Sequence, residues 1–323
     1  MSDAPRDGRS SSGLIPYSAI VGQDDMKLAL ELAYVQPAIS GVLLTGERGT
    51  AKSTIVRAFA RTLYGADKPL VVLPINATED RVVGGWNVEK LVQEYKSEEM
   101  PGLLEEANGR ILYIDEVNLL DDHIVNIILD VAASGELVIQ REGLRRTVQI
   151  QFTIVGTMNP EEGTLRPQLL DRFDLFVQVR AETDRRAEIL SRMLALDATI
   201  QAPVDTAESA IRTEYRAQDD ALLIRLVQAR ERCHTIIVDD EMVDACARLA
   251  DKLEADGHRG ECVLARSAQA FAAIEGADRV TRMHLNRLAR LAFQHRSRLV
   301  DRSQGWGEDH DRVVKSVLEQ AEK

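Results

Sequence analysis

The chain has 323 residues, of which 45% are hydrophobic and 28% charged, a balance typical of a globular protein with a buried core. Its 40 basic and 52 acidic residues give a formal charge of −12, which argues against a protein that coats nucleic acid, because such binding depends on Lys and Arg neutralising phosphates. A length of this order favours two domains.

The N-terminal residues 1–13 are polar and rich in serine, and we expect a disordered tail there. They lack the apolar run of a secretory signal, and no later stretch is apolar for long enough to span a membrane. The three cysteines, Cys233, Cys246 and Cys262, have no metal-site spacing. These features predict a cytoplasmic protein with no membrane span and no nucleic-acid partner.

The first part of the chain, residues 14–192, alternates short apolar runs with helical patterns, which predicts a parallel sheet with crossover helices. Helices are expected over Ala51–Leu63 and Asp122–Ser134, and a hairpin over Leu137–Gln140 and Leu144–Val148. The expected strands are Gly41–Leu44, Val71–Pro74, Ile111–Ile114, Phe152–Val155 and Leu175–Val179.

The second part of the chain is expected to be helical. Residues 193–220 are less periodic, contain Pro203 and many small polar residues, and predict a linker. From residue 221 to 323 the apolar spacing is helical throughout, and Thr281 is a candidate N-cap. The sequence therefore predicts an α/β core followed by an all-helical domain.

A glycine-containing loop follows the first expected strand and is one residue away from the phosphate-binding pattern G-x-x-x-x-G-K-[ST]. In such a loop the backbone N–H groups converge on phosphates at a helix N-terminus. Lys52 is expected to reach the β- and γ-phosphates of ATP, and Ser53 to bind Mg²⁺. The loop consists of Gly46, Glu47, Arg48, Gly49, Thr50, Ala51, Lys52, Ser53 and Thr54.

One loop position departs from the pattern, because Ala51 stands where the second glycine is usual. We expect Ala51 to enter the helix without a positive φ, so that the loop keeps its shape. The alternative interpretation is an ordinary strand-to-helix turn with an incidental lysine.

Two further strands end in polar residues. Asp115 and Glu116 follow four apolar residues, at the sheet edge where α/β proteins bind ligands. Asp115 is expected to hold Mg²⁺, and Glu116 to orient and deprotonate the attacking water. Asn159, at the end of the next strand, could lie beside the same water, or Asn159-Pro160 could simply start a turn.

These three elements, in this order, resemble those of the AAA+ ATPases, and the chain is similar to the I-subunit family of magnesium chelatase. A weaker match lies in the helical part, at 259–268. The similarity in the core rests on residues 20–30, 46–54, 79–84, 101–108, 113–125, 159–163 and 165–173.

The resemblance implies a P-loop NTPase (AAA+) core with a C-terminal helical lid, assembled in a six-membered ring with ATP at each subunit interface. By resemblance, Val21 and Gly22 lie near the adenine and Asn159 is the first sensor. Arg172 is the arginine finger that reaches the neighbour's γ-phosphate. Arg266 is the lid sensor that contacts ATP within its own subunit.

Positive charge opposite the γ-phosphate is what phosphoryl transfer requires, so arginines suit both roles. Other interpretations remain open: Arg166 is a rival for the finger, and Arg172 could form a surface ion pair with Asp171 or Asp174. Arg266 could lie on a solvated helix face.

The family further implies that ATP hydrolysis drives Mg²⁺ insertion into protoporphyrin IX, a step of chlorophyll biosynthesis. The implied partners are a second AAA+ subunit with a von Willebrand factor A domain and a large porphyrin-binding subunit. Besides Ala51, the short connection from Gly65 to Val71 departs from photosynthetic members of the family.

Three alternatives stay open at this point. The chain could be a chelatase-like, MoxR-type ATPase that works with a von Willebrand factor A partner to remodel or metallate another protein. It could be a nucleotide-switched assembly module. A DNA helicase also fits the Ala-Lys-Ser loop, although the acidic charge argues against it.

Overall fold

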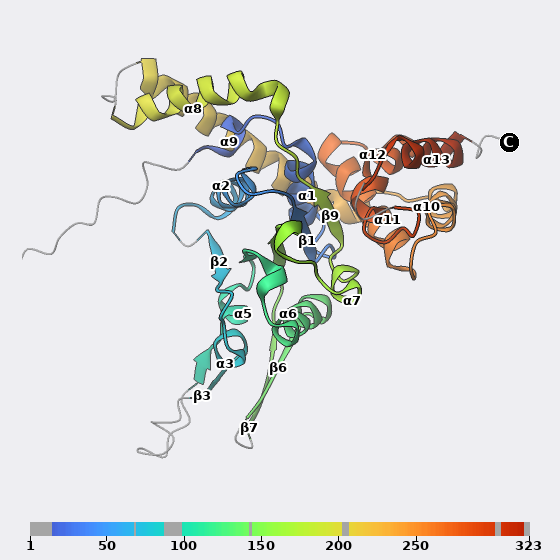
Figure 1. The fold of residues 1–323 in the computed structure, drawn as a ribbon, viewed down its shortest axis with the longest axis horizontal. Helices are drawn as coiled ribbons and strands as arrows, with labels where there is room; N and C mark the ends of the chain where they lie inside the picture. Colours follow the sequence, from blue (N-terminus) through green and yellow to red (C-terminus); the bar gives the residue numbers. More distant parts are fainter. Residues whose placement is uncertain are drawn as a thin grey trace, which may run out of the picture.

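The core of the protein is a five-stranded parallel sheet in the strand order β2-β5-β8-β1-β9 (Figure 1). The computed structural model describes residues 15–67, 69–86, 99–141, 144–201, 207–300 and 305–319, so the tail expected over 1–13 lies outside the described residues. The expected parallel sheet is confirmed. Its strands are β1 (Gly41–Thr45), β2 (Leu70–Leu73), β5 (Ile111–Ile114), β8 (Thr153–Met158) and β9 (Leu175–Gln178).

The strands are apolar on both faces because each face of the sheet is covered. Val42 and Leu44 of β1 pack into one hydrophobic cluster with helices α1 (Asp24–Val35) and α2 (Lys52–Tyr64). Leu43, between them, packs into the opposite cluster with α5 (Leu103–Glu106) and α6 (Asp122–Ser134). Successive side chains of a strand point to opposite faces, so a doubly covered strand shows no polar alternation.

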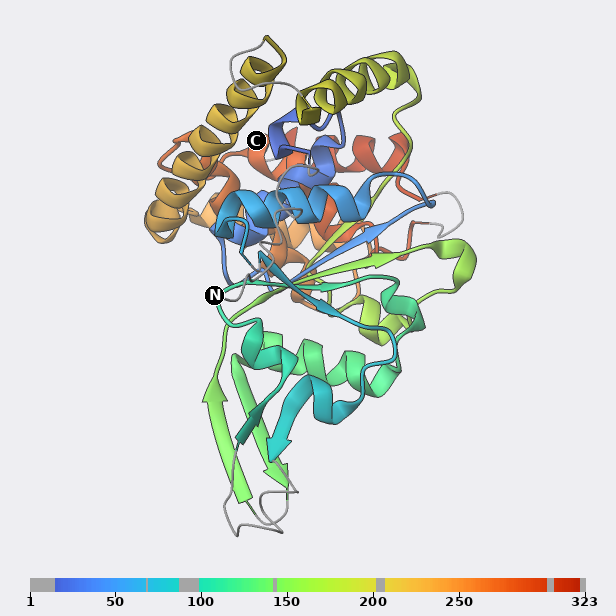
Figure 2. The ribbon, with the colours of Figure 1, turned by 90° about the vertical axis from the view of Figure 1, so that its left-hand side faces the viewer.

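Two β-hairpins extend together from one end of the core, as the second view shows (Figure 2). One is β3 (Gly84–Trp86) with β4 (Glu99–Pro101), which follows α3 (Glu79–Val83). The other is β6 (Glu136–Arg141) with β7 (Leu144–Gln149), as the sequence predicts. The short connecting helices are η1 (Tyr17–Ala19), η2 (Val117–Leu119), η3 (Pro160–Glu162), α7 (Pro167–Leu170) and η4 (Thr183–Arg185).

The C-terminal helices gather beside β9, where α12 packs on that strand and α11 on α1 (Figure 1). No helix of the described residues is long and apolar enough to cross a membrane. These helices, with the short η5 (Cys233–Thr235) before them, are α10 (Asp240–Lys252), α11 (Arg259–Glu275), α12 (Arg282–Phe293) and α13 (Glu308–Glu319).

The prediction of a linker over 193–220 is wrong, because the described residues of this stretch are helical. Helix α8 (Arg186–Gln201) and helix α9 (Ala207–Arg232) occupy its described residues and pack on each other. Their apolar residues do not form one continuous stripe, so the helical period is weak, but Ala, Leu, Glu, Gln and Arg are strong helix formers. The expected domain boundaries at 192 and 221 therefore fall inside continuous helices.

A buried histidine lies at the junction between the sheet and the C-terminal helices. The Nε2 atom of His295 donates to the Phe173 carbonyl at 2.9 Å, and its ring stacks on Phe176 with 5.3 Å between ring centroids. Burial, and secondarily the neighbouring Arg296, hold the pKa of His295 well below its ordinary value of 6.5. His295 is therefore neutral in the folded protein, and the charged form is excluded.

This histidine predicts a pH-dependent loss of stability. Below pH 6.5 the unfolded chain takes up a proton at His295 that the folded chain excludes, so the free energy of unfolding falls as the pH is lowered. Between pH 7.5 and 5.5 we expect this group to account for about 1.4 kcal/mol of lost stability. Urea unfolding of His295→Gln should show a pH loss smaller by that amount, and equal losses in the two proteins would contradict the assignment.

Candidate nucleotide-binding site

A pocket of about 720 Å³ opens at the edge of the sheet where the parallel strands end. Gly22, Gly46 and Glu47 do not line it, although each is next in sequence to a residue of its wall or loop. The expected site residues that do line it are Val21, Arg48, Gly49, Thr50, Ala51, Lys52, Ser53, Thr54, Asp115, Glu116 and Asn159. The structure thus brings together the three motifs that the sequence singled out.

The loop after β1 is closed by its own lysine. Lys52 Nζ donates to the carbonyl oxygens of Gly46 at 2.6 Å and Glu47 at 2.7 Å. Gly46 has a φ of +156° and lies against the Val179 carbonyl, where a Cβ would collide. Burial lowers the pKa of Lys52, and the carboxylates of Asp115 and Glu116 oppose that shift. The ammonium therefore lies between the loop carbonyls and the acidic pair.

The conformation of Ala51 corrects the sequence-based expectation. Ala51 has φ 63° and ψ 15°, the left-handed region, and it is the N-cap of α2 rather than part of the helix. The chain must turn sharply between the loop and the helix, so the position keeps the geometry that a glycine would adopt freely. An alanine there carries strain of about 1–2 kcal/mol.

The first carboxylate of the acidic pair is held from one side. Asp115 Oδ1 accepts from Thr157 Oγ1 at 2.6 Å and from the Tyr113 hydroxyl at 2.9 Å. Thr157 Oγ1 also accepts from the Glu116 backbone N–H at 3.1 Å. Sequence reasoning missed Thr157, and its only signal was a polar residue inside the apolar strand β8. Both hydrogen bonds fall on the same oxygen, so Oδ2 is the atom of Asp115 that can serve a ligand.

The second carboxylate follows β5 in a left-handed conformation. Glu116 has φ 53° and ψ 55°, and its Oε1 lies 3.7 Å from Arg48 Nη2. The Arg48 guanidinium also contacts Glu162. An arginine of the phosphate loop therefore bridges two carboxylates from two other loops, a contact that the sequence did not predict.

Asn159 combines the two interpretations given for it. Its side chain is 5% exposed and lines the pocket, and its Oδ1 accepts from the Glu161 backbone N–H at 3.3 Å. It thus starts the η3 turn at Pro160 and also faces the pocket that contains Glu116.

The remaining wall of the pocket is largely apolar. Ile20 and Val21 form one side, and α8 adds the other, which sequence reasoning missed because it named no helix directly after the last expected strand and expected a linker from residue 193 on. The residues from α8 are Arg186, Ile189, Arg192, Met193 and Leu196. A largely apolar wall with a few polar groups at one end is typical of a pocket for a small organic ligand.

The segment that carries this wall is held by two carboxylates from later in the chain. Asp219 of α9 accepts from the backbone N–H groups of Tyr17 at 3.1 Å and Ser18 at 2.8 Å. Glu182 accepts from the Gln23 N–H at 2.7 Å and lies against Gly22, where a Cβ would collide. Gly22, with φ +69°, is therefore required for the close approach of Glu182.

The two arginines expected to act on the γ-phosphate lie elsewhere, in a second pocket of about 780 Å³. This pocket also contains Ser40 and Asp174, which precede β1 and β9, so it lies at the opposite edge of the sheet. The expectation that Arg266 contacts ATP within its own subunit is not met, because Arg266 lines this second pocket and not the first.

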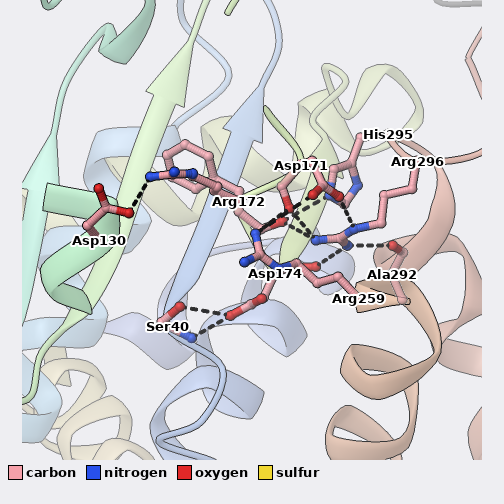
Figure 3. Close-up of polar contacts among 10 residues, drawn as sticks. Ser40, Asp130, Asp171, Arg172, Asp174, Arg259, Ala292, His295 and Arg296 are labelled. Carbon is pink, nitrogen blue, oxygen red and sulfur yellow. Dashed lines mark hydrogen bonds and ion pairs between the residues drawn. The ribbon is translucent and has the colours of Figure 1, made fainter. Parts of the chain in front are cut away.

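Arg172 pairs with neither of the two aspartates proposed for it. Its Nη1 lies 2.6 Å from Asp130 Oδ1 of α6, and Figure 3 shows the side chain directed away from Asp171 and Asp174. The rival Arg166 pairs with Asp122 at 2.6 Å and lines neither pocket. Of the two, only Arg172 shares a pocket with Arg266.

Comparison with protein families agrees with this geometry. Residues 41–173 match the family model of the AAA domain (dynein-related subfamily), and residues 243–317 match that of the AAA lid domain. The fold, the phosphate loop and the acidic pair therefore define an AAA ATPase with a C-terminal lid.

Curated relatives narrow the class. The chain is 42% identical to the magnesium-chelatase 38 kDa subunit of Rhodobacter capsulatus, over 90% of each protein. It is also 42% identical to the uncharacterized protein Rv2850c of Mycobacterium tuberculosis, over 88% of this chain and 45% of that protein. A chain in a structure of the complex between subunits BchI and BchD of magnesium chelatase is 40% identical, with a TM-score of 0.51, over 94% of this chain and 99% of that one. The chain belongs to the family of the magnesium-chelatase 38 kDa subunit.

The strained alanine gives a prediction. Ala51→Gly should raise the free energy of unfolding by about 0.5–1 kcal/mol, because relief of the left-handed strain exceeds the added entropy of the unfolded chain. Urea denaturation measures the change. The matched control is Ala217→Gly, on the exposed face of α9, which should instead lower stability by about 1 kcal/mol. A loss of stability in both variants would contradict the strain.

Proposed function

We propose that this chain is the ATP-hydrolysing ring subunit that drives insertion of Mg²⁺ into protoporphyrin IX, as part of a cytoplasmic magnesium chelatase in chlorophyll biosynthesis. The observation that carries the proposal is the convergence of the phosphate loop, the acidic pair and Asn159 on one pocket. The similarity to magnesium-chelatase subunits extends over nearly the whole chain and supports the particular reaction.

The phosphate loop binds the negatively charged phosphates of the nucleotide. Its backbone N–H groups and the start of α2 face the phosphates, and Lys52 leaves the carbonyls of Gly46 and Glu47 to pair with the β- and γ-phosphates. Val21, Ile189 and Met193 enclose the base. ATP is therefore bound by local dipoles and one ammonium, in a protein whose net charge is −12.

The residues of the pocket also suit a magnesium ion. Ser53 and Asp115 both line it, and a hydroxyl and a carboxylate are the hard oxygen donors that Mg²⁺ prefers. The two hydrogen bonds to Asp115 Oδ1 leave Oδ2 available to the ion. The bound ion would neutralise charge on the β- and γ-phosphates.

Glu116 is the general base for the attacking water. Its backbone is fixed by Thr157, so the carboxylate is aimed by the end of β5 and by its left-handed conformation. Arg48 Nη2 lies 3.7 Å from Glu116 Oε1 and helps to orient the carboxylate that accepts the proton. Asn159, in the wall of the same pocket, orients the water with its amide.

Arg172 and Arg266 act on a neighbouring subunit's nucleotide. They lie at the amino-terminal edge of the sheet, roughly 16 Å from the phosphate loop along a five-residue strand such as β1. A head-to-tail contact between copies places one subunit's second pocket against the next subunit's first pocket, and repetition of that contact closes a ring, which we propose to be a hexamer. Arg172 is then the finger and Arg266 the second arginine of that site.

The other partners are proposed from the relatives. The similarity to a chain of the BchI–BchD complex supports a second chelatase subunit as the partner of this chain. We propose that this partner is an AAA+ subunit with a von Willebrand factor A domain. A large subunit would bind the porphyrin. The β3–β4 and β6–β7 hairpins, which extend together from the core, are suitable contacts for these subunits (Figure 2).

Removing the general base separates binding from hydrolysis. Glu116→Gln keeps the size of the side chain but cannot accept the proton, so ATP hydrolysis should fall by about 100-fold or more while ATP affinity is kept. Phosphate release and binding of a fluorescent ATP analogue measure the two effects. Glu106→Gln, an exposed carboxylate on α5, is the control and should leave both unchanged. Undiminished hydrolysis in Glu116→Gln would contradict the role of Glu116.

The reaction itself is tested by reconstitution with the two partner subunits from the same organism. The fluorescence of magnesium protoporphyrin should appear only with ATP, and Glu116→Gln should abolish it. An active ATPase that yields no magnesium protoporphyrin in the presence of functional partners would overturn the chelatase proposal and favour a protein-directed ATPase.

A further inference from the structure

One arginine outside both pockets is fully buried, at the junction between the AAA domain and the lid. Arg296 follows α12, and its side chain is 0% exposed. A guanidinium has five N–H donors, and an unpaired buried one would be strongly destabilising. All five are matched by acceptors: Nε bonds Asp171 Oδ1, Nη1 bonds the carbonyls of Asp174 and Ala292, and Nη2 bonds the carbonyls of Asp171 and Phe173.

Four of these five bonds leave the lid and end on the segment Asp171–Asp174, at distances from 2.8 to 3.0 Å (Figure 3). This segment carries Arg172. Three of the four acceptors are backbone carbonyls, so the guanidinium fixes the path of the chain rather than one side chain. Burial lowers the pKa of Arg296, and the carboxylates of Asp171 and Asp174 oppose that shift.

Other residues hold the same segment. Arg259 Nη1 donates to the Asp171 carbonyl at 3.1 Å, and His295 donates to the Phe173 carbonyl at 2.9 Å. On the side of the sheet, Asp174 accepts from the backbone N–H of Ser40, which precedes β1, at 2.6 Å. The segment is thus fastened to both domains.

Arg172 itself is left out of this cluster. Its guanidinium pairs with Asp130, and its side chain is 34% exposed and lines the second pocket. We propose that Arg296 is a positioning residue for Arg172: the lid of each subunit sets the position of the arginine that the same subunit offers to its neighbour's ATP. This inference rests on the proposed action of Arg172 across the subunit interface.

Arg296→Lys tests the hydrogen bonds that the Arg296 guanidinium makes to the segment Asp171–Asp174. Lysine keeps the charge but has three donors on one atom and cannot span three carbonyls and a carboxylate. Misplacement of a catalytic group by about 1 Å lowers rates by about 100-fold, so we expect ATP hydrolysis by the variant alone to fall by about that factor. Its own nucleotide pocket is intact, so its ATP affinity should stay that of the unmodified protein.

Mixed rings separate positioning from a general structural effect. Lys52→Ala lacks its own ATP site but keeps its finger, and Arg172→Ala keeps its site but lacks a finger. In a 1:1 mixture about one interface in four pairs an intact site with an intact finger, and hydrolysis returns. Arg296→Lys should behave as Arg172→Ala does: rescued by Lys52→Ala and not rescued by Arg172→Ala.

The control is Arg287→Lys, which alters a different ion pair between lid and core, that of Arg287 with Asp25. This variant should hydrolyse ATP at the normal rate when no second variant is mixed with it. If Arg296→Lys cannot bind ATP, Asp171→Ala replaces it, because it removes one of the five hydrogen bonds of Arg296. Asp171→Ala should lose less ATP hydrolysis, and Lys52→Ala but not Arg172→Ala should restore it. If Lys52→Ala restores hydrolysis to Arg172→Ala but not to the Arg296 or Asp171 variant, only the positioning role of Arg296 is overturned. No rescue of Arg172→Ala overturns the action of Arg172 across the interface, and this inference with it.

Discussion

The parallel direction of the five strands is the constraint on which the other features depend. Because the strands run the same way, their carboxyl ends meet at one edge and collect Lys52, Asp115, Glu116 and Asn159 in one pocket. Their amino ends meet at the other edge, where Arg172 lies. The groups proposed to bind ATP and the arginine proposed to complete a neighbour's site are therefore separated by the length of a strand, so one subunit cannot bring them together.

Much of the first pocket could be predicted because its chemistry is local in sequence. The strand preceding Asp115 is buried on both faces, which leaves only apolar residues before the acidic pair, and the loop around Lys52 has its own spacing. The ends of neighbouring parallel strands must then converge. Thr157 escaped prediction because its role depends on register: Ile114 pairs with Gly156, so Asp115 comes beside the next residue.

The predictions from sequence are wrong where tertiary contacts determine the local backbone or the position of a residue. The left-handed backbone of Ala51 is imposed by a turn that alanine itself does not favour. Helices α8 and α9 lack a clear apolar stripe and are stabilised by packing on each other and by residue propensity. The location of Arg266 depends on the placement of the lid beside β9 and α1, which no motif in the chain encodes.

The apolar wall of the first pocket is anchored by a part of the chain far from the phosphate loop. Ile20 and Val21 precede the whole sheet, and the turn that carries them is anchored by Asp219, which lies about two hundred residues later in the chain. The phosphate loop has no part in this anchor. Under the proposed function, the contacts to the phosphates and the contacts to the base are therefore held by separate parts of the chain, so loosening this anchor alters the base contacts and leaves the phosphate loop in place.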